Sequence, residues 1–130
     1  MDLGTHDTRA ASEAGAPMRV YGPDGSLLMD GDEPVTITLC GADSPKFSAA
    51  QKAIAKRRGM QAARNGSDRE LNDLIELMAD VTVGWSGIDY LGQAPFPCTK
   101  ANAIRLYTDL RWLLEQVISF VTERANYLGN

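Results

Sequence analysis

The sequence feature that constrains the fold most is an apolar stripe at helical spacing near the end of the chain. Its members recur at intervals of three, four or seven residues: Leu110, Leu113, Leu114, Val117, Val121 and Leu128. Such spacing places them on one face of a helix. The stripe predicts a helix over residues 110–128, capped by Asp109, which must bury that face against other elements. A shorter helix over residues 100–108 is expected to begin after Thr99, a good N-cap.

A second periodicity, of two residues, precedes the helical part of the chain. Val35, Ile37 and Leu39 alternate with Thr36, Thr38 and Cys40. This alternation is typical of a half-buried strand. Two short β-prone runs, 18–21 and 26–29, flank the turn sequence "GPDG" upstream of it. We therefore predict an antiparallel β meander over residues 18–40, packed on the helices by its apolar face.

Two further helices are predicted between these regions, over residues 45–64 and 68–82. Ser44 is a good N-cap for the first, and Asn65 is expected to end it. Ser67 with Glu70 three residues later forms a capping box for the second. A loop rich in glycine and proline follows, and we expect its Trp85 to plug the core.

Together these elements predict an α+β fold, mainly a small α-helical bundle with an N-terminal antiparallel β meander. The 130 residues fit one domain, which we place at residues 17–130. Residues 1–16 contain almost no large apolar side chain, so they are expected to form a flexible arm or to dock on another surface.

Composition narrows the functional classes. The net charge is −4 and the isoelectric point is about 4.9, which disfavours a general nucleic-acid binder. The sequence has no apolar run of membrane-spanning length and no secretory signal pattern. We expect the cytoplasm as the compartment, with Cys40 and Cys98 as buried free thiols.

Residues that could carry a reaction are sparse. His6 is the only histidine, and no ligand-spaced partners surround it. The "GWSG" run lacks the second glycine of a nucleophile elbow, and there is no histidine to complete a triad. Asp30, Asp32 and Glu33 fit a polar turn better than a calcium loop. We therefore expect no enzymatic activity, no cofactor and no bound metal.

The strongest local charge feature is the basic run of the first long helix. It contains Lys52, Lys56, Arg57 and Arg58. These residues either contact an acidic partner or form a solvated face balanced by acidic residues elsewhere. Nucleic-acid binding is less favoured because no aromatic residues are interleaved after Phe47.

Three segments of the chain carry a family resemblance. They are "LGTHDTRAASEAGAPMRVYGPDG", "PVTITLCGADSPKFSAAQ" and "VTVGWSGIDYLGQAPFPCTKANAIRLYTDLRWLLEQVISFVTERANYLG". Over these segments the chain resembles the tail assembly chaperones of long-tailed bacteriophages and their prophage relatives. The most telling features are Trp85 between two glycines, the Pro95-Phe96 pair and the final helix.

The resemblance implies a non-enzymatic protein of the host cytoplasm that binds the tape measure protein. It also implies assistance to tail tube protein subunits as they polymerise around that protein. The oligomeric state stays open, a homo-oligomer included. Two alternatives remain: a structural tail or neck component of the virion, and a small nucleic-acid-binding regulator.

Four residues lie off the main seam of the last two helices and are candidates for the partner surface. They are Leu106, Tyr107, Trp112 and Phe120. If exposed, they would form an aromatic and aliphatic patch of the kind that marks interaction sites. The alternative is that the β meander covers them.

Overall fold

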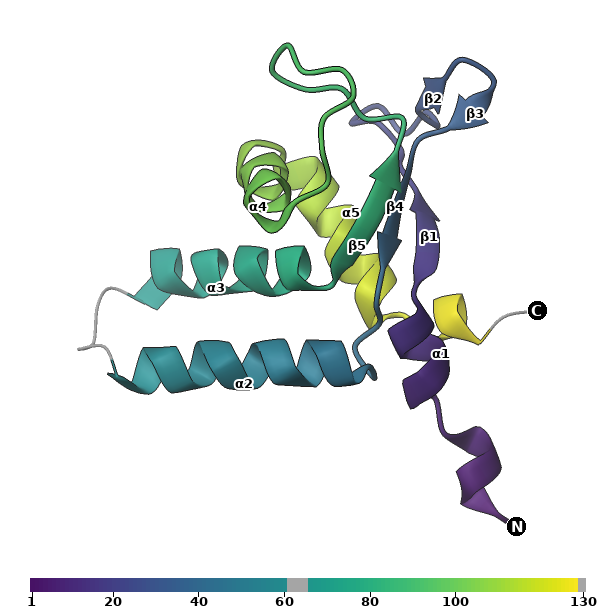
Figure 1. The fold of residues 1–130 in the computed structure, drawn as a ribbon, viewed down its shortest axis with the longest axis vertical. Helices are drawn as coiled ribbons and strands as arrows, with labels where there is room; N and C mark the ends of the chain where they lie inside the picture. The colour runs from purple at the N-terminus through teal and green to yellow at the C-terminus, as the bar shows by residue number, and fades with distance from the viewer. Residues whose placement is uncertain (61–65, 129–130) are drawn as a thin grey trace.

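A computed structural model of the chain describes residues 1–60 and 66–128, apart from the side chains of residues 60, 66 and 67. Within this part the fold is α+β and mainly helical, with a small antiparallel sheet, as predicted. Figure 1 shows the sheet crossed by one helix, with a helical hairpin projecting to one side.

The sheet is built around β4 (Thr36–Leu39), which pairs with β1 (Ala16–Arg19) and with β5 (Thr82–Ser86). Both pairings are antiparallel and both put a partner opposite Ile37. The predicted alternation is confirmed, since Ile37 and Leu39 are 0% exposed while the threonines between them are partly exposed. A strand with a partner on each side and a buried face explains this pattern.

The predicted meander order is wrong. β1 does not pair with the segment that follows it but with β4, and a separate ribbon of β2 (Met29–Asp30) and β3 (Glu33–Pro34) lies between them in sequence. The hairpin predicted around "GPDG" is confirmed in part: Tyr21 and Leu27 form a bridge, and the Leu28 N–H donates to the Val20 carbonyl at 3.0 Å. The last residue of the run 26–29, Met29, belongs to β2. The turn residues predicted the chain reversals correctly. Strand pairing depended instead on covering both edges of β4, which local turn chemistry cannot specify.

Two long helices form the hairpin: α2 (Pro45–Met60) and α3 (Gly66–Asp80). Ser44 caps α2 as predicted, because its Oγ accepts a hydrogen bond from the Phe47 N–H at 3.1 Å. The predicted stop at Asn65 lies outside the described residues, as does the Ser67 side chain of the capping box. α3 ends two residues earlier than predicted, because Thr82 already belongs to β5.

Two shorter helices, α4 (Lys100–Asp109) and α5 (Arg111–Thr122), lie on one face of the sheet, with α5 running behind it in Figure 1. Thr99 caps α4 as predicted, accepting from the Asn102 N–H at 3.1 Å. Asp109 does not cap the last helix. It is the final residue of α4, and Leu110 precedes α5 without a side-chain cap.

The last helix is also shorter than predicted. It ends at Thr122, and a 3-10 turn, η2 (Arg124–Tyr127), follows. Glu123 caps that turn by accepting from the Ala125 N–H. The turn buries the Tyr127 ring against Phe120 and leaves Leu128 exposed, so packing of an aromatic ring ended the apolar stripe early.

The first sixteen residues carry structure that sequence analysis did not predict. They form a 3-10 turn, η1 (Leu3–His6), the helix α1 (Arg9–Ala14) and the start of β1. Ser12 is buried, and the Glu13 carboxylate accepts from the Lys46 N–H at 3.0 Å. The second half of this arm therefore docks on the start of α2.

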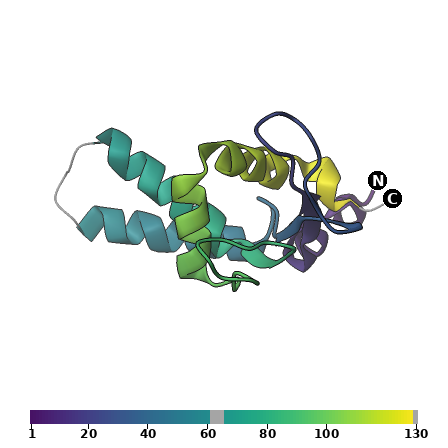
Figure 2. The same ribbon diagram turned by 90° about the horizontal axis from the view of Figure 1, so that it is seen from above.

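A single core cluster joins the sheet to the helices. Its side chains come from β1, β4, α3, α4 and α5. Figures 1 and 2 show α1 and the C-terminal turn η2 on the side of the sheet away from the helical hairpin. Among the described residues, no helix is both long and apolar enough to cross a membrane.

Candidate partner-binding surface

The four residues predicted to form one patch divide into two pairs. Leu106 and Tyr107 are only 2% and 0% exposed, so the prediction that they belong to a binding surface is wrong. α4 packs between its neighbours so that both side chains enter the core. The Tyr107 hydroxyl lies 2.7 Å from the Thr82 Oγ1, which satisfies a buried polar group. Burial raises the pKa of Tyr107, so this hydroxyl stays protonated.

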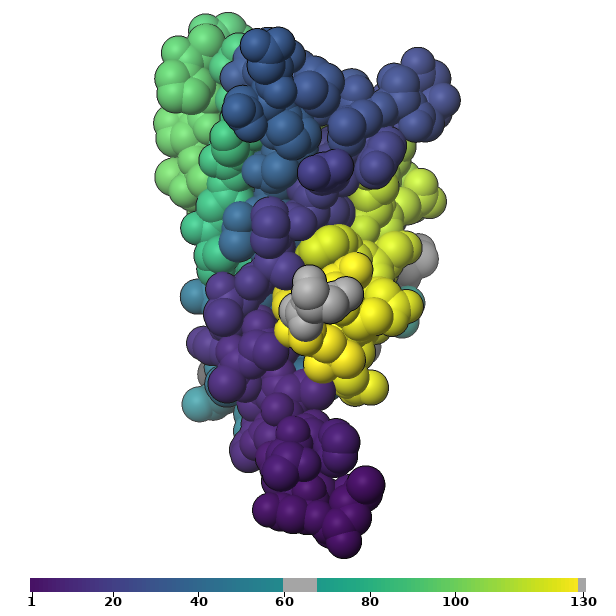
Figure 3. All heavy atoms as spheres, turned by 90° about the vertical axis from the view of Figure 1, so that its right-hand side faces the viewer, coloured from purple at the N-terminus to yellow at the C-terminus, as the bar shows by residue number. Residues whose placement is uncertain are grey.

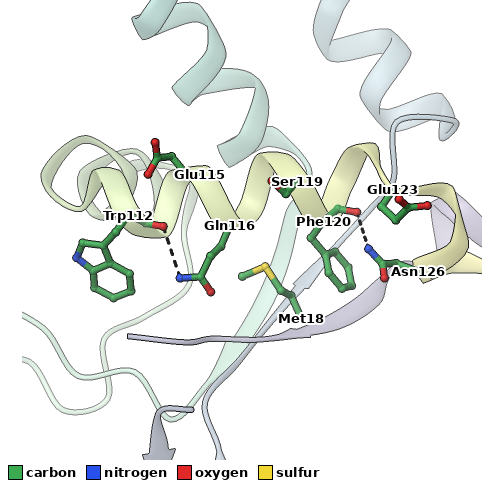
Figure 4. A pocket seen from close by; sticks show the side chains of 8 residues that line it. All are labelled: Met18, Trp112, Glu115, Gln116, Ser119, Phe120, Glu123 and Asn126. Carbon is green, nitrogen blue, oxygen red and sulfur yellow. Dashed lines mark hydrogen bonds between the residues drawn. The ribbon is translucent and has the colours of Figure 1, made fainter. Parts of the chain in front are cut away.

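Trp112 and Phe120 are half-buried and line one groove along α5. They stand eight residues apart on the same face of the helix, with Gln116 between them (Figure 4). Met18 of β1 contributes the opposing apolar wall. The groove encloses about 610 Å³, within the range of pockets that hold ligands.

Two amide side chains hold the walls of the groove. In its middle, Gln116 Oε1 accepts from the Tyr21 N–H at 2.9 Å, and Gln116 Nε2 donates to the Tyr21 carbonyl at 2.6 Å. At the end near η2, Asn126 Nδ2 donates to the Phe120 carbonyl at 3.0 Å. These bonds fix α5 against the end of β1 and against η2, so the groove is preformed.

The charge of the groove is one-sided. Its charged lining residues are Glu115 and Glu123, both carboxylates, and the rest of its polar lining is neutral. The sequence patterns did not indicate Met18, Gln116 or these two acids as site residues. The i, i+4, i+8 spacing from Trp112 to Phe120 passes through Gln116 and could have indicated it.

The four basic residues predicted to steer a partner also divide into two pairs. Lys52 and Lys56 are exposed on α2. Arg57 and Arg58 instead form ion pairs with α3: Arg57 lies 2.9 Å from Glu76, and both arginines contact Asp73. The alternative of a face balanced by acidic residues therefore describes the arginines better.

A second groove runs between α2 and α3, beside these ion pairs. It encloses about 510 Å³, and its apolar lining comes from Ile54, Leu74 and Leu77. Lys52 and Arg58 stand on its rim with Asp73. Unlike the groove along α5, it carries charges of both signs.

The residues that carry the family resemblance form a packing unit. Trp85 lies on β5, not in a loop as predicted, and it is half-buried. Its Nε1 donates to the Phe96 carbonyl at 2.7 Å, and the two rings stack with centroids 6.0 Å apart. Tyr90 meets the same Phe96 ring edge-on at 5.5 Å. The unit fastens the segment between β5 and α4 onto the sheet.

Residues with reactive side chains stay apart in the described structure. Cys40 is buried as predicted, but Cys98 is exposed, so the expectation that both thiols are buried is wrong for Cys98. His6 is exposed in η1. Within residues 1–60 and 66–128, no three histidine, cysteine or carboxylate side chains gather as a metal site requires.

Compared with protein-family models, with curated proteins and with solved structures, the chain has no match in any of the three. The resemblance to tail assembly chaperones accordingly stays a prediction, and the groove along α5 is the candidate site that the described residues offer.

Proposed function

We propose that this protein is a non-enzymatic tail assembly chaperone of a long-tailed bacteriophage or prophage. It would bind the tape measure protein in the host bacterial cytoplasm and assist polymerisation of the tail tube protein around it. The observation that supports this most is the preformed groove along α5, where Trp112 and Phe120 remain half-buried in a chain with a complete core. Half-exposed aromatic side chains in a concave surface are typical of protein-binding sites.

The distribution of the motif residues also supports a binding role. The Trp85, Tyr90 and Phe96 rings contact one another, and their polar atoms are used in structural hydrogen bonds. Burial raises the pKa of the Cys40 thiol, which opposes formation of a nucleophilic thiolate. These residues therefore stabilise the fold, and the fold leaves the groove along α5 open to a partner.

The test is co-expression with the tape measure protein, which the proposal expects to be encoded beside this gene. We expect the tape measure protein to stay in the soluble fraction only when this chain is present. Trp112→Asp should lower the soluble fraction at least about fivefold, because a carboxylate would be desolvated at the contact. Val83→Asp, at an exposed residue of β5 outside the groove, is the matched control and should leave it unchanged.

Because Trp112 also contacts the core, a second variant is needed. Ser119→Lys replaces a small exposed side chain in the groove with a long one. It should lower the soluble fraction of the tape measure protein without changing the melting temperature of this chain. A tape measure protein that is soluble alone, or equal effects of the Trp112 and Val83 variants, would contradict the proposal. Detection of this chain in purified virions would favour the alternative of a structural tail or neck component.

A nucleic-acid-binding regulator remains the weaker alternative. It would use the basic face of α2, where Arg57 and Arg58 are already engaged by Asp73 and Glu76. A shift of DNA or RNA mobility at low salt that disappears at high salt would support it.

A further inference from the structure

The outer edge of β1 offers backbone groups to a further strand. The Val20 N–H donates to the Val35 carbonyl at 3.0 Å, on the side of β4. N–H and carbonyl groups of successive strand residues point to alternate sides. The N–H and carbonyl of Arg19 and the carbonyl of Pro17 therefore point away from β4. β1 ends the three-stranded sheet on this side.

Gln116 shows that this edge accepts a peptide-like group. The Tyr21 N–H and carbonyl continue the outward series, and the Gln116 amide binds both, at 2.9 and 2.6 Å. A primary amide that donates to a carbonyl and accepts from the N–H of one residue reproduces what a neighbouring strand does. The position of a further strand is thus already marked at one end of the edge.

The groove along α5 runs beside the same edge. Figure 4 shows β1 lying next to α5, with Met18 and Phe120 between them. In a strand added to β1, every second side chain would lie on the face of Met18 and meet Trp112 and Phe120. Glu115 and Glu123 supply negative charge along the same groove, so basic residues on that face of the added segment, beside the apolar ones, would be favoured.

We infer that the outer edge of β1 is a docking site for an extended partner segment whose side chains on the side of α5 include both apolar residues and lysine or arginine, and which joins the sheet as its fourth strand beside α5. The affinity would come from main-chain hydrogen bonds and the specificity from alternate side chains, as in other cases of strand addition. For the identity of the client this inference rests on the proposed function; the docking surface itself does not.

Two substitutions at one position separate the backbone from the side chain. Arg19→Pro removes the outward N–H and leaves the inward ladder to β4 intact, since proline is tolerated at a strand edge. Arg19→Ala keeps the N–H and removes only the exposed side chain. The probe is a fluorescein-labelled heptapeptide, Thr-Lys-Thr-Phe-Thr-Lys-Thr, in which the lysines and the phenylalanine share one face of the strand. Its binding to the purified full chain is followed by fluorescence anisotropy.

We expect saturable binding. Arg19→Pro should lower the affinity about tenfold, because one main-chain hydrogen bond to the peptide is lost. Arg19→Ala should lower the affinity less than about twofold, because that hydrogen bond is kept. A peptide with methylated amide nitrogens at alternate positions should not bind, and a version with glutamate for lysine should bind much more weakly. Glu115→Gln should lower the affinity for the basic peptide. Asp32→Asn, in the distant β2–β3 turn, should leave that affinity unchanged.

Three outcomes would overturn the inference. They are no binding at millimolar peptide, equal binding of the methylated peptide, and equal effects of the two Arg19 variants when both melt like the wild type. None of these bears on whether the chain keeps the tape measure protein soluble, so failure here leaves the proposed function to its own test.

Discussion

At the scale of single residues, Trp85 shows how a recognisable motif serves the fold. The indole stacks on Phe96 almost in parallel, at an interplanar angle of 3°, and its N–H is satisfied by the Phe96 carbonyl. The ring is half-buried. The residue therefore joins the end of β5 to the segment before α4 through both apolar contact and a hydrogen bond.

Trp85→Ala should lower the free energy of unfolding by about 3 kcal/mol, because stacking, burial and the hydrogen bond are lost together. Trp85→Phe keeps a stacking ring and loses the bond, so the expected cost is about 1 kcal/mol. Urea denaturation followed by circular dichroism measures both. An alanine variant as stable as the wild type would show that the Phe96 contact contributes nothing.

Gly41 is a residue whose small size is required by its neighbours. A Cβ at this position would lie 2.4 Å from the Ser12 Oγ and 2.8 Å from the Tyr127 Cε2. Gly41→Ala should therefore cost about 2 kcal/mol of stability through overpacking. Gly84→Ala is the matched control, since a Cβ there meets nothing within 4 Å. Thermal melts of the two variants should differ clearly, and similar melts would refute the packing argument.

At the scale of elements, the start of α2 is held by more than its cap. Ser44 is buried, accepts from the Phe47 N–H and donates to the Gly41 carbonyl at 2.7 Å. Glu13 of α1 accepts from the Lys46 N–H of the same turn. The first turn of α2 is thus the place where the N-terminal arm joins the domain.

Ser44→Ala should destabilise the protein by about 1–2 kcal/mol, since a buried cap is lost with both of its hydrogen bonds. Ser48→Ala, one turn later on the exposed side of the helix, should change stability by less than about 0.5 kcal/mol. Equilibrium unfolding in urea distinguishes the two. Equal effects would mean that the cap contributes little.

At the scale of the whole molecule, α1 and the C-terminal turn η2 pack together on one face. Figure 3 shows the two segments side by side. Asp43 joins them, because its carboxylate accepts from the Thr8 hydroxyl at 2.7 Å and from the Arg124 guanidinium at 2.9 Å. The groove along α5 opens near this junction, so the ends of the chain help to hold the candidate site.

The contacts of Asp43 with Thr8 and Arg124 predict that the free energy of unfolding falls at acidic pH. The hydrogen bonds from Arg124 and Thr8 lower the pKa of Asp43 from 3.8 to about 2. The native state binds this proton less tightly than the unfolded state. The stabilisation is therefore present above pH 4 and is lost as the pH falls towards 2.

Comparing the wild type with Asp43→Asn should show a difference in melting temperature at pH 6 that shrinks between pH 4 and pH 2. The Asp43 carboxylate is partly exposed, so the difference should also decrease in high salt. In an Arg124→Gln background the pH dependence should be much weaker. A difference that is constant with pH would show that the ion pair does not contribute to stability.

The sequence by itself determined the local structure of this protein. Side-chain periodicity identified β4 and the core face of α5, and hydrogen-bonding side chains identified the starts of α2 and α4, because these features depend on neighbours within one or two turns. Only the tertiary structure decided which strands pair, where α5 ends and which aromatic residues face the solvent. β4 pairs along both of its edges, and its second partner, β5, formed from a segment that was predicted as the end of a helix and a loop. Packing of α4 placed Tyr107 in the core and left Trp112 and Phe120 beside the edge of β1. Those choices depend on contacts between residues far apart in sequence, which local patterns cannot specify.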